Sequence, residues 1–100
     1  MMVVNVSKET VAIVEENLIK LSGHINMDAV SNFYAQGIKS LMTPIEVVDC
    51  SKVKEADSSC LALLLYFQSL IDHPLKVLSL PDDLKVLVNL YNLDDVFHFS

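Results

Sequence analysis

The sequence predicts an α/β domain in which a small mixed β-sheet carries about three helices packed on one side. Short β-branched segments alternate with longer segments of helical periodicity, in the order β-β-α-β-α-β-α. The chain has 100 residues, of which 52% are hydrophobic and 20% charged. That length suits one domain with its own core and leaves no room for a second. We therefore expect a single domain over residues 1–100, with its core within about residues 11–97.

The first element that the sequence predicts clearly is a β-hairpin. The β-branched segments Val11–Val14 and Leu18–Leu21 flank a polar turn at Glu15–Asn17. Gly23 is expected to end the second strand. Residues Met1–Ser7 form either a short preceding strand or a frayed end, and the sequence leaves that choice open.

A first helix is expected after Asn26, a residue type that caps helix N-termini, with Asp28 placed favourably in its first turn. Pro44 prevents its continuation. Ile45–Cys50 is then expected to form a buried strand, followed by a polar turn at Ser51–Ala56. The helix presents an apolar stripe at helical spacing to the core: Val30, Phe33, Tyr34, Ile38 and Leu41.

A second helix is predicted over Cys60–Ile71, and its composition is apolar almost all round. A further strand is predicted at Leu75–Leu78. Ser79–Asp82 is typical of a helix start, because proline and acidic residues are favoured in the first turn. Asn92 is a residue type that can end this third helix, and Asp94–Ser100 is expected to form a tail.

The charge balance excludes several classes of partner. Thirteen acidic residues oppose seven basic ones, all of them lysines, so the formal net charge is −6. Arginine, whose planar side chain reads guanine and holds phosphate bidentately, is absent, and we expect no nucleic-acid partner. No polybasic cluster would attract an anionic membrane. The longest apolar run, Cys60–Phe67, is too short for a membrane span, so we expect no direct membrane insertion.

The first residues lack the basic and apolar segments of a secretory signal, so we expect a cytoplasmic protein. His24, His73 and His98 are widely separated, as are Cys50 and Cys60, unlike the close pairs of zinc sites. We expect no metal and no cofactor. No phosphate-binding loop, nucleophile elbow or directed triad is evident, so we expect no enzymatic activity and no catalytic residues. Both cysteines are expected to be reduced and to serve as small hydrophobic residues.

Asp57, Ser58 and Ser59 stand at a predicted strand-to-helix junction, where two interpretations apply. In the first, Asp57 or Ser58 is an N-cap that accepts hydrogen bonds from the free amide groups of the second helix. The three residues also suit a docking or switching point, because a phosphate there would add roughly −1.5 to −2 charges near a helix N-terminus. The two roles are compatible, since a capping residue can also contact a partner.

The second helix is another candidate for partner contact. A helix that lies between a sheet and other helices is apolar on several faces, but so small a domain can hardly bury every face of three helices. An exposed apolar patch would mark a partner site. Two alternatives therefore stay open: Leu61, Leu65 and Tyr66 face a partner, or part of the third helix does.

Several stretches of the sequence resemble STAS domains, the small domains shared by sulfate transporters and anti-sigma-factor antagonists. Leu21–Ile25 is similar to the end of their second strand, and Val48–Ser51 followed by Ala56–Leu64 resembles their signature strand, loop and helix. The closing Leu87–Leu93 resembles one branch in particular, the cytoplasmic subunits of phospholipid-transporting ABC complexes. The resemblance covers roughly residues 11–97.

The resemblance implies a mixed sheet with helices on one side, and function by binding rather than catalysis. In that branch the STAS subunit binds the ATPase of the ABC transporter, and through it the membrane permease, and supports assembly and activity. It thereby helps to maintain outer-membrane lipid asymmetry. The resemblance places Ser58, which follows the signature residue Asp57, at the contact with the ATPase. It also implies a location at the inner membrane that depends on this partner.

The same resemblance allows an anti-sigma-factor antagonist, in which a serine of this loop is phosphorylated reversibly. Ser58 and Ser59 are both candidates for that modification. Cys60 stands where the family usually has glycine. This departure is harmless in a regular first helical turn, and disruptive if the position needs a backbone angle that favours glycine.

Overall fold

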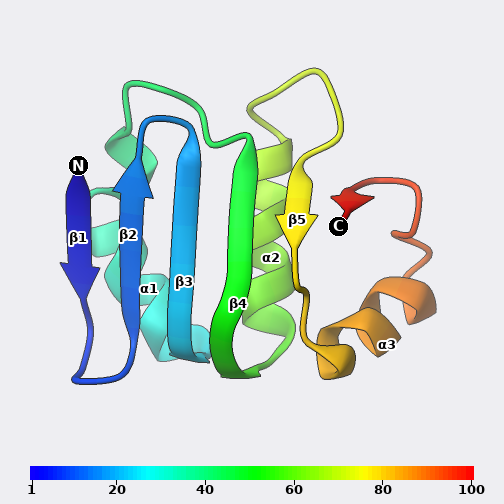
Figure 1. The fold of residues 1–100 in the computed structure, drawn as a ribbon, viewed down its shortest axis with the longest axis horizontal. Helices are drawn as coiled ribbons and strands as arrows, with labels where there is room; N and C mark the ends of the chain where they lie inside the picture. Colours follow the sequence, from blue (N-terminus) through cyan, green and yellow to red (C-terminus); the bar gives the residue numbers. More distant parts are fainter.

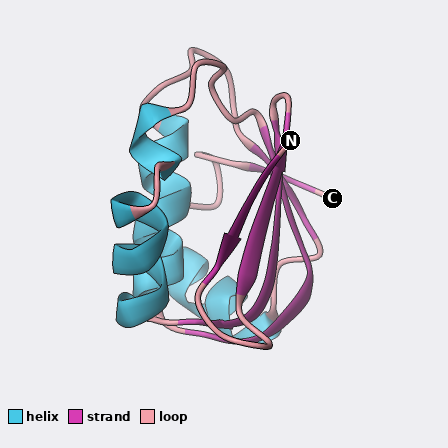
Figure 2. Cartoon of the chain, turned by 90° about the vertical axis from the view of Figure 1, so that its left-hand side faces the viewer, coloured by secondary structure: helices cyan, strands magenta, loops and turns pink.

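Two layers make up the fold: a six-stranded β-sheet and three α-helices that cover one of its faces (Figure 1, Figure 2). The structure is a computed structural model that describes residues 1–100. The predicted fold class, a mixed sheet with helices on one side, is confirmed. In chain order the elements are β1 (Met2–Asn5), β2 (Val11–Glu15), β3 (Leu18–Ile25), α1 (Met27–Ala35), the 3-10 helix η1 (Ile38–Ser40), β4 (Val47–Ala56), α2 (Ser58–Gln68), β5 (Lys76–Leu78), α3 (Asp82–Leu90) and β6 (His98–Phe99).

Strand order in the sheet follows chain order, from β1 at one edge to β6 at the other (Figure 1). The pairs β1–β2 and β2–β3 are antiparallel, whereas β3, β4, β5 and β6 run parallel to one another. Parallel neighbours need a crossover connection, and α1, α2 and α3 lie in the three crossovers. Consequently β3, β4 and β5 end at one edge of the sheet, and each is followed there by a helix N-terminus (Figure 1).

The predicted hairpin is confirmed as β2 and β3, whose register places Glu15 opposite Leu18. Glu16, in the two-residue turn, has a φ of 54°, the left-handed conformation that tight hairpin turns use. The choice left open at the N-terminus is also decided. Residues 2–5 form β1, which pairs antiparallel with β2 and buries Val4.

Gly23 lies inside β3 and does not end it, contrary to the prediction, because the strand continues to Ile25. Its φ is +86°, a conformation that glycine adopts far more readily than other residues. The register against β4 shifts between Gly23 and His24. A Cβ atom at this position would lie 2.8 Å from the Cα atom of Thr10. Glycine therefore lets the β1–β2 loop approach the strand, and the result is an irregularity in the strand rather than its end.

Ser51–Ala56, predicted as a polar turn, is the second half of β4. It pairs in parallel with the second half of β3, as far as Ile25 opposite Ala56. The other neighbour, β5, pairs only with Val47–Asp49, so the extension has one neighbouring strand and one open edge. Its polar composition follows from this exposure, which is why the sequence resembles a turn.

The first two predicted helices are present with different ends. α1 is capped by Asn26 as predicted but ends at Ala35, earlier than the apolar stripe. The stripe continues past Gly37 into η1, where Ile38 is buried. α2 spans Ser58–Gln68 rather than the predicted residues 60–71. It begins earlier because Asp57 already caps it, and it ends with Ser69 as its C-cap.

The C-terminus of α3 confirms the role predicted for Asn92. This residue has a φ of 58°. Its N–H donates to the carbonyl of Asn89, and the N–H of Leu93 donates to the carbonyl of Val88. This pair of hydrogen bonds closes helices whose next residue is left-handed, a conformation that asparagine tolerates.

Asp94–Ser100 is more than the predicted tail, because it contributes β6, which runs parallel to β5. The N–H of His98 donates to the carbonyl of Leu75, and Phe97 is buried beside the strand. One buried aromatic residue and a two-residue strand give almost no periodicity. The sequence pattern therefore does not reveal this element.

α2 contacts both α1 and α3 and supplies much of the core. This central position explains why the helix is apolar on several faces, as expected for a helix that lies between a sheet and other helices. None of the helices combines the length and the apolar character needed to cross a bilayer. The buried residues of α2 are Cys60, Leu61, Leu63, Leu64 and Phe67.

Candidate functional site

Of the site residues predicted from the sequence, Asp57, Ser58 and Ser59 lie at the edge formed by the carboxyl ends of the parallel strands, at the bottom of Figure 1. The first two helices that start here are capped by side chains. Oδ1 of Asn26 accepts a hydrogen bond from the Ala29 N–H at 3.0 Å, and Oδ1 of Asp57 accepts one from the Ser59 N–H at 2.8 Å. The corresponding position before α3 is Pro81, which offers no side-chain cap. In open α/β sheets this edge is the usual place for binding.

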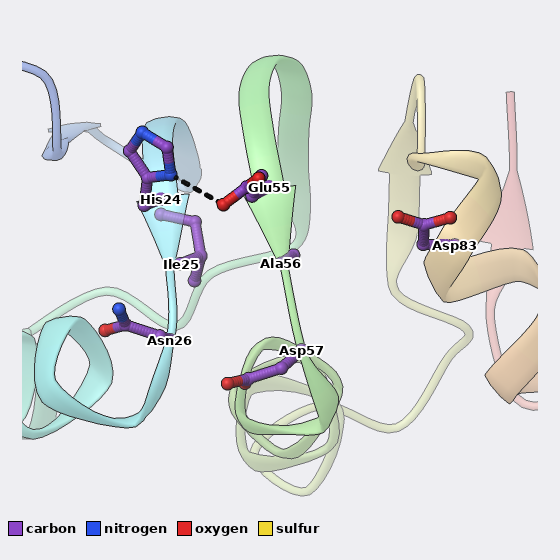
Figure 3. A pocket seen from close by; sticks show the side chains of 7 residues that line it. All are labelled: His24, Ile25, Asn26, Glu55, Ala56, Asp57 and Asp83. Carbon is purple, nitrogen blue, oxygen red and sulfur yellow. Dashed lines mark hydrogen bonds and ion pairs between the residues drawn. The ribbon is translucent and has the colours of Figure 1, made fainter.

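A hollow of about 310 Å³ opens at this edge, between the ends of β3 and β4 and the first turn of α3 (Figure 3). Glu55, Asp57 and Asp83 contribute carboxylates to its lining, and no lysine contributes. Asp83 is not among the site residues predicted from the sequence, because no local pattern shows that α3 begins beside α2. The hollow is therefore a negatively charged depression. Its remaining lining residues are His24, Ile25, Asn26 and Ala56.

His24 links two segments at the border of the hollow. Its Nδ1 lies 3.1 Å from Oε2 of Glu55, and this contact is the dashed line in Figure 3. Its Nε2 lies 3.3 Å from Oε2 of Glu9. Lys54 Nζ lies 3.4 Å from Oε1 of the same Glu9. The hydrogen bond from Lys54 and its positive charge, followed by the hydrogen bond from His24, lower the pKa of the Glu9 carboxyl. These residues come from three segments that are distant in the sequence, the β1–β2 loop, β3 and β4, so only the fold brings them together.

The position of His24 depends on its backbone contacts with the β1–β2 loop. Thr10 is the buried polar residue of the chain. Its hydroxyl accepts a hydrogen bond from the His24 N–H at 3.1 Å and lies 3.4 Å from the His24 carbonyl, to which it donates. The left-handed Gly23 permits this approach. The backbone of this edge is therefore fixed, while the side chains around the hollow remain accessible.

Asp57, Ser58 and Ser59 are brought to this edge as the sequence predicts, but they differ in their surroundings. Asp57 caps α2, so the capping interpretation holds for this residue. Ser58 is the first residue of the helix; it is exposed, and its hydroxyl makes no hydrogen bond within the chain, unlike the capping carboxylate. Ser59 is half-buried. Neither serine hydroxyl makes a hydrogen bond within the chain, and Ser58 is the more exposed of the two.

The predicted partner-facing residues of α2 divide into two groups. Leu61 is only 3% exposed and belongs to the core, so the expectation that it faces a partner is corrected. Leu65 is 37% exposed, and Tyr66 is half-buried, with its ring packed edge-on against Tyr34 at 5.5 Å between centroids. The exposed stripe of α2 follows helical spacing through Ser58, Ala62 and Leu65, and continues to Ser69, the residue that follows the helix.

Both cysteines are buried free thiols, as predicted. Burial, and to a lesser degree the charge of Asp49, raise the pKa of Cys50 to about 12. Burial likewise raises the pKa of Cys60. Cys60 sits in the regular first turn of α2, where its N–H donates to the Asp57 carbonyl at 3.0 Å, so the absence of glycine here causes no backbone strain. No group of three or more His, Cys, Asp or Glu residues is arranged to hold a metal ion.

The element order, the mixed sheet and the single helical layer define an α/β domain of the STAS type. The model of the family described as "Mlab, STAS domain" matches residues 10–98, and the chain belongs to this family. No curated protein matches the chain significantly. Family membership confirms the resemblance found in the sequence and supports an accessory or regulatory role of the STAS type.

Proposed function

We propose that the chain is a non-catalytic accessory subunit of the MlaB type, which binds the ATPase of a phospholipid-transporting ABC complex and supports its assembly and activity. Through the ATPase it associates with the permease, on the cytoplasmic side of the inner membrane, and contributes to outer-membrane lipid asymmetry. The family match over residues 10–98 supports this role. The observation that carries the proposal is the free hydroxyl of Ser58 at the exposed start of α2.

The fold does not require a hydroxyl at this position. Asp57 accepts the hydrogen bond that caps α2, so the Ser58 side chain contributes little to the helix end. A small hydroxyl can donate and accept hydrogen bonds in a contact between two proteins. We infer that Ser58 contacts the ATPase as an unmodified serine and that the stripe of α2 extends this contact.

The test measures binding of the purified chain to the purified ATPase subunit of its host's phospholipid ABC transporter. Ser58→Glu adds bulk and charge at the centre of the proposed contact, and we expect at least roughly tenfold weaker binding. Ser31→Glu is the matched control, because it places the same change on the exposed surface of α1. Circular dichroism should show both variants folded. If Ser58→Glu binds at full strength, the proposed contact is wrong.

An anti-sigma-factor antagonist is the second candidate, because an exposed serine hydroxyl is equally accessible to a kinase. A phosphate on Ser58 would stand next to Asp57, at the border of a hollow that Glu55 and Asp83 also line, and the like charges would repel. This electrostatic setting favours the transporter role. Intact-mass measurement of the chain isolated from its host distinguishes the two: stoichiometric phosphate on Ser58 or Ser59 supports the antagonist.

A further inference from the structure

The outer face of α3 exposes more apolar surface than its place in the fold explains. Val86 is 66% exposed and Leu90 is 67% exposed, four residues apart on one side of the helix. Tyr91, the residue after the helix, is half-exposed. The core uses the other side of α3, where Leu84 and Val88 are buried. Exposed apolar side chains that cluster on one helix face mark an interaction site.

This apolar face continues from the hollow described above. Asp83, Val86 and Leu90 have the spacing i, i+3, i+7 and therefore lie along one side of α3. The Asp83 side chain also lines the hollow with Glu55 and Asp57 (Figure 3). One line of residues thus runs from the acidic edge beside the start of α2 along the outside of α3.

We propose, as an extension of the proposed function, that this face of α3 is the second half of the docking surface for the ATPase. The partner covers Val86 and Leu90 with apolar side chains and presents lysine or arginine toward Asp83. The carboxylates of the hollow have no lysine among them, so a basic partner surface complements their charge. Contacts along both α2 and α3 then fix the orientation of the subunit, which a contact at Ser58 alone does not.

A second copy of the chain fits this face less well than a larger basic partner. Three partly exposed side chains of these types offer on the order of 250 Å² per copy, against about 800 Å² per partner in a stable interface. Two copies would also bring together chains that each carry a net charge of −6. The same negative charge opposes binding to an anionic lipid surface.

The experiment compares Val86→Ser/Leu90→Ser with Met27→Ser in binding to the purified ATPase subunit. Met27 is 69% exposed on α1, so its substitution removes similarly exposed apolar surface from another helix. We expect the α3 variant to bind at least about tenfold more weakly and Met27→Ser to bind like the wild type. Asp83→Asn should bind a few-fold more weakly and reduce the dependence of affinity on salt. Thermal unfolding of each variant shows that the fold is retained.

The outcomes separate this inference from the proposed function. If Ser58→Glu weakens binding and the α3 variant does not, the α3 face is not part of the docking surface, while the proposed function stands. If the wild-type chain does not bind the ATPase at all, the proposed function fails. Concentration-dependent dimerisation that Val86→Ser/Leu90→Ser abolishes would assign the face to a second copy and overturn the inference. Co-sedimentation with phosphatidylglycerol vesicles that the same variant abolishes would overturn it in favour of a membrane.

Discussion

The two ends of the parallel sheet use their polar side chains differently. At the amino end, Glu46 joins neighbouring loops: its N–H donates to the Asn17 carbonyl at 2.8 Å, its carboxylate accepts from Asn17 Nδ2 at 2.8 Å, and its Oε1 lies 2.9 Å from Nε2 of His73. At the carboxyl end, Ser58 and Asp83 make no such side-chain contact and remain exposed. The polar groups of Glu46 and His73 at the amino end are thus bonded within the fold, whereas those of Ser58 and Asp83 at the carboxyl end are not.

The end of α2 strengthens this contrast. Nε2 of Gln68 donates to the His73 carbonyl at 2.8 Å, and Oε1 of the same amide accepts from the Leu75 N–H at 2.7 Å. The C-terminus of α2 is thus tied to the start of β5. The N-terminus of the same helix, by contrast, is closed by Asp57 alone. The carboxyl end is shaped mainly by the backbone conformation of Gly23 and the hydroxyl of Thr10. The following substitutions test the differences between the two ends.

Gly23→Ala should have the largest effect, because it breaks the backbone geometry of the carboxyl end. An alanine must adopt a φ of +86° and place its Cβ 2.8 Å from the Thr10 Cα. We expect a loss of roughly 3 kcal/mol in unfolding free energy, measured by urea denaturation. Gly37→Ala is the control: its φ is +117°, but the Cβ meets only the flexible end of Met2, so a loss of about 1 kcal/mol is expected. Equal losses for the two variants would contradict the role given to the β1–β2 loop.

Gln68→Ala should remove the amino-end link between α2 and β5. The Leu75 N–H then loses its hydrogen-bond partner in a buried residue, and we expect a loss of about 2 kcal/mol in unfolding free energy. Gln36→Ala, at the exposed end of α1, is the matched control and should change stability by less than about 0.5 kcal/mol. Amide hydrogen exchange should become faster at Leu75 and not at the carboxyl end. A loss no larger than that of the control would show that the link does not stabilise the fold.

The smallest effect concerns Glu9, whose pKa is lowered mainly by Lys54. A carboxyl group with a lower pKa in the folded state stabilises the fold above its unfolded-state pKa, and this stabilisation disappears as the pH falls through the folded-state pKa. Lys54→Met should therefore raise the pKa of Glu9 toward its usual value and flatten the decline of stability in acid. NMR titration of the Glu9 carboxyl measures this change. Lys52→Met removes an exposed lysine from the same strand and should leave the Glu9 titration unchanged.

Local chemistry explains which parts of the fold the sequence predicts. Asn26 and Asp57 cap helices because their side chains reach amides only two or three residues away, and such contacts can be inferred from the residue types alone. The hairpin of β2 and β3 is likewise defined by neighbouring segments. Ser51–Ala56 and β6 are different, since each is a strand only because of a partner strand distant in sequence.

In the candidate site, too, the sequence predicts the residues that local contacts define and misses those that the fold brings together. Asp57 and Ser58 are recognised from their position before an apolar helix, and the structure places them at the predicted junction. Asp83 and the contact of His24 with Glu9 come from other parts of the chain, so no spacing in the sequence indicates them. The prediction that Leu61 faces a partner is wrong because apolar composition does not show which face of α2 is buried.

Asp57 has a consequence for how this sequence can vary during evolution. If folding were the only requirement, several short polar residues could replace Asp57, because Asn, Ser and Thr cap helices nearly as well as Asp. A basic partner that pairs with the carboxylates of the hollow would require a carboxylate there as well. The two pressures act on a single side chain, so folding and recognition cannot drift independently at this position. A lineage that lost its partner would be free to replace Asp57 with a neutral capping residue while keeping α2 intact.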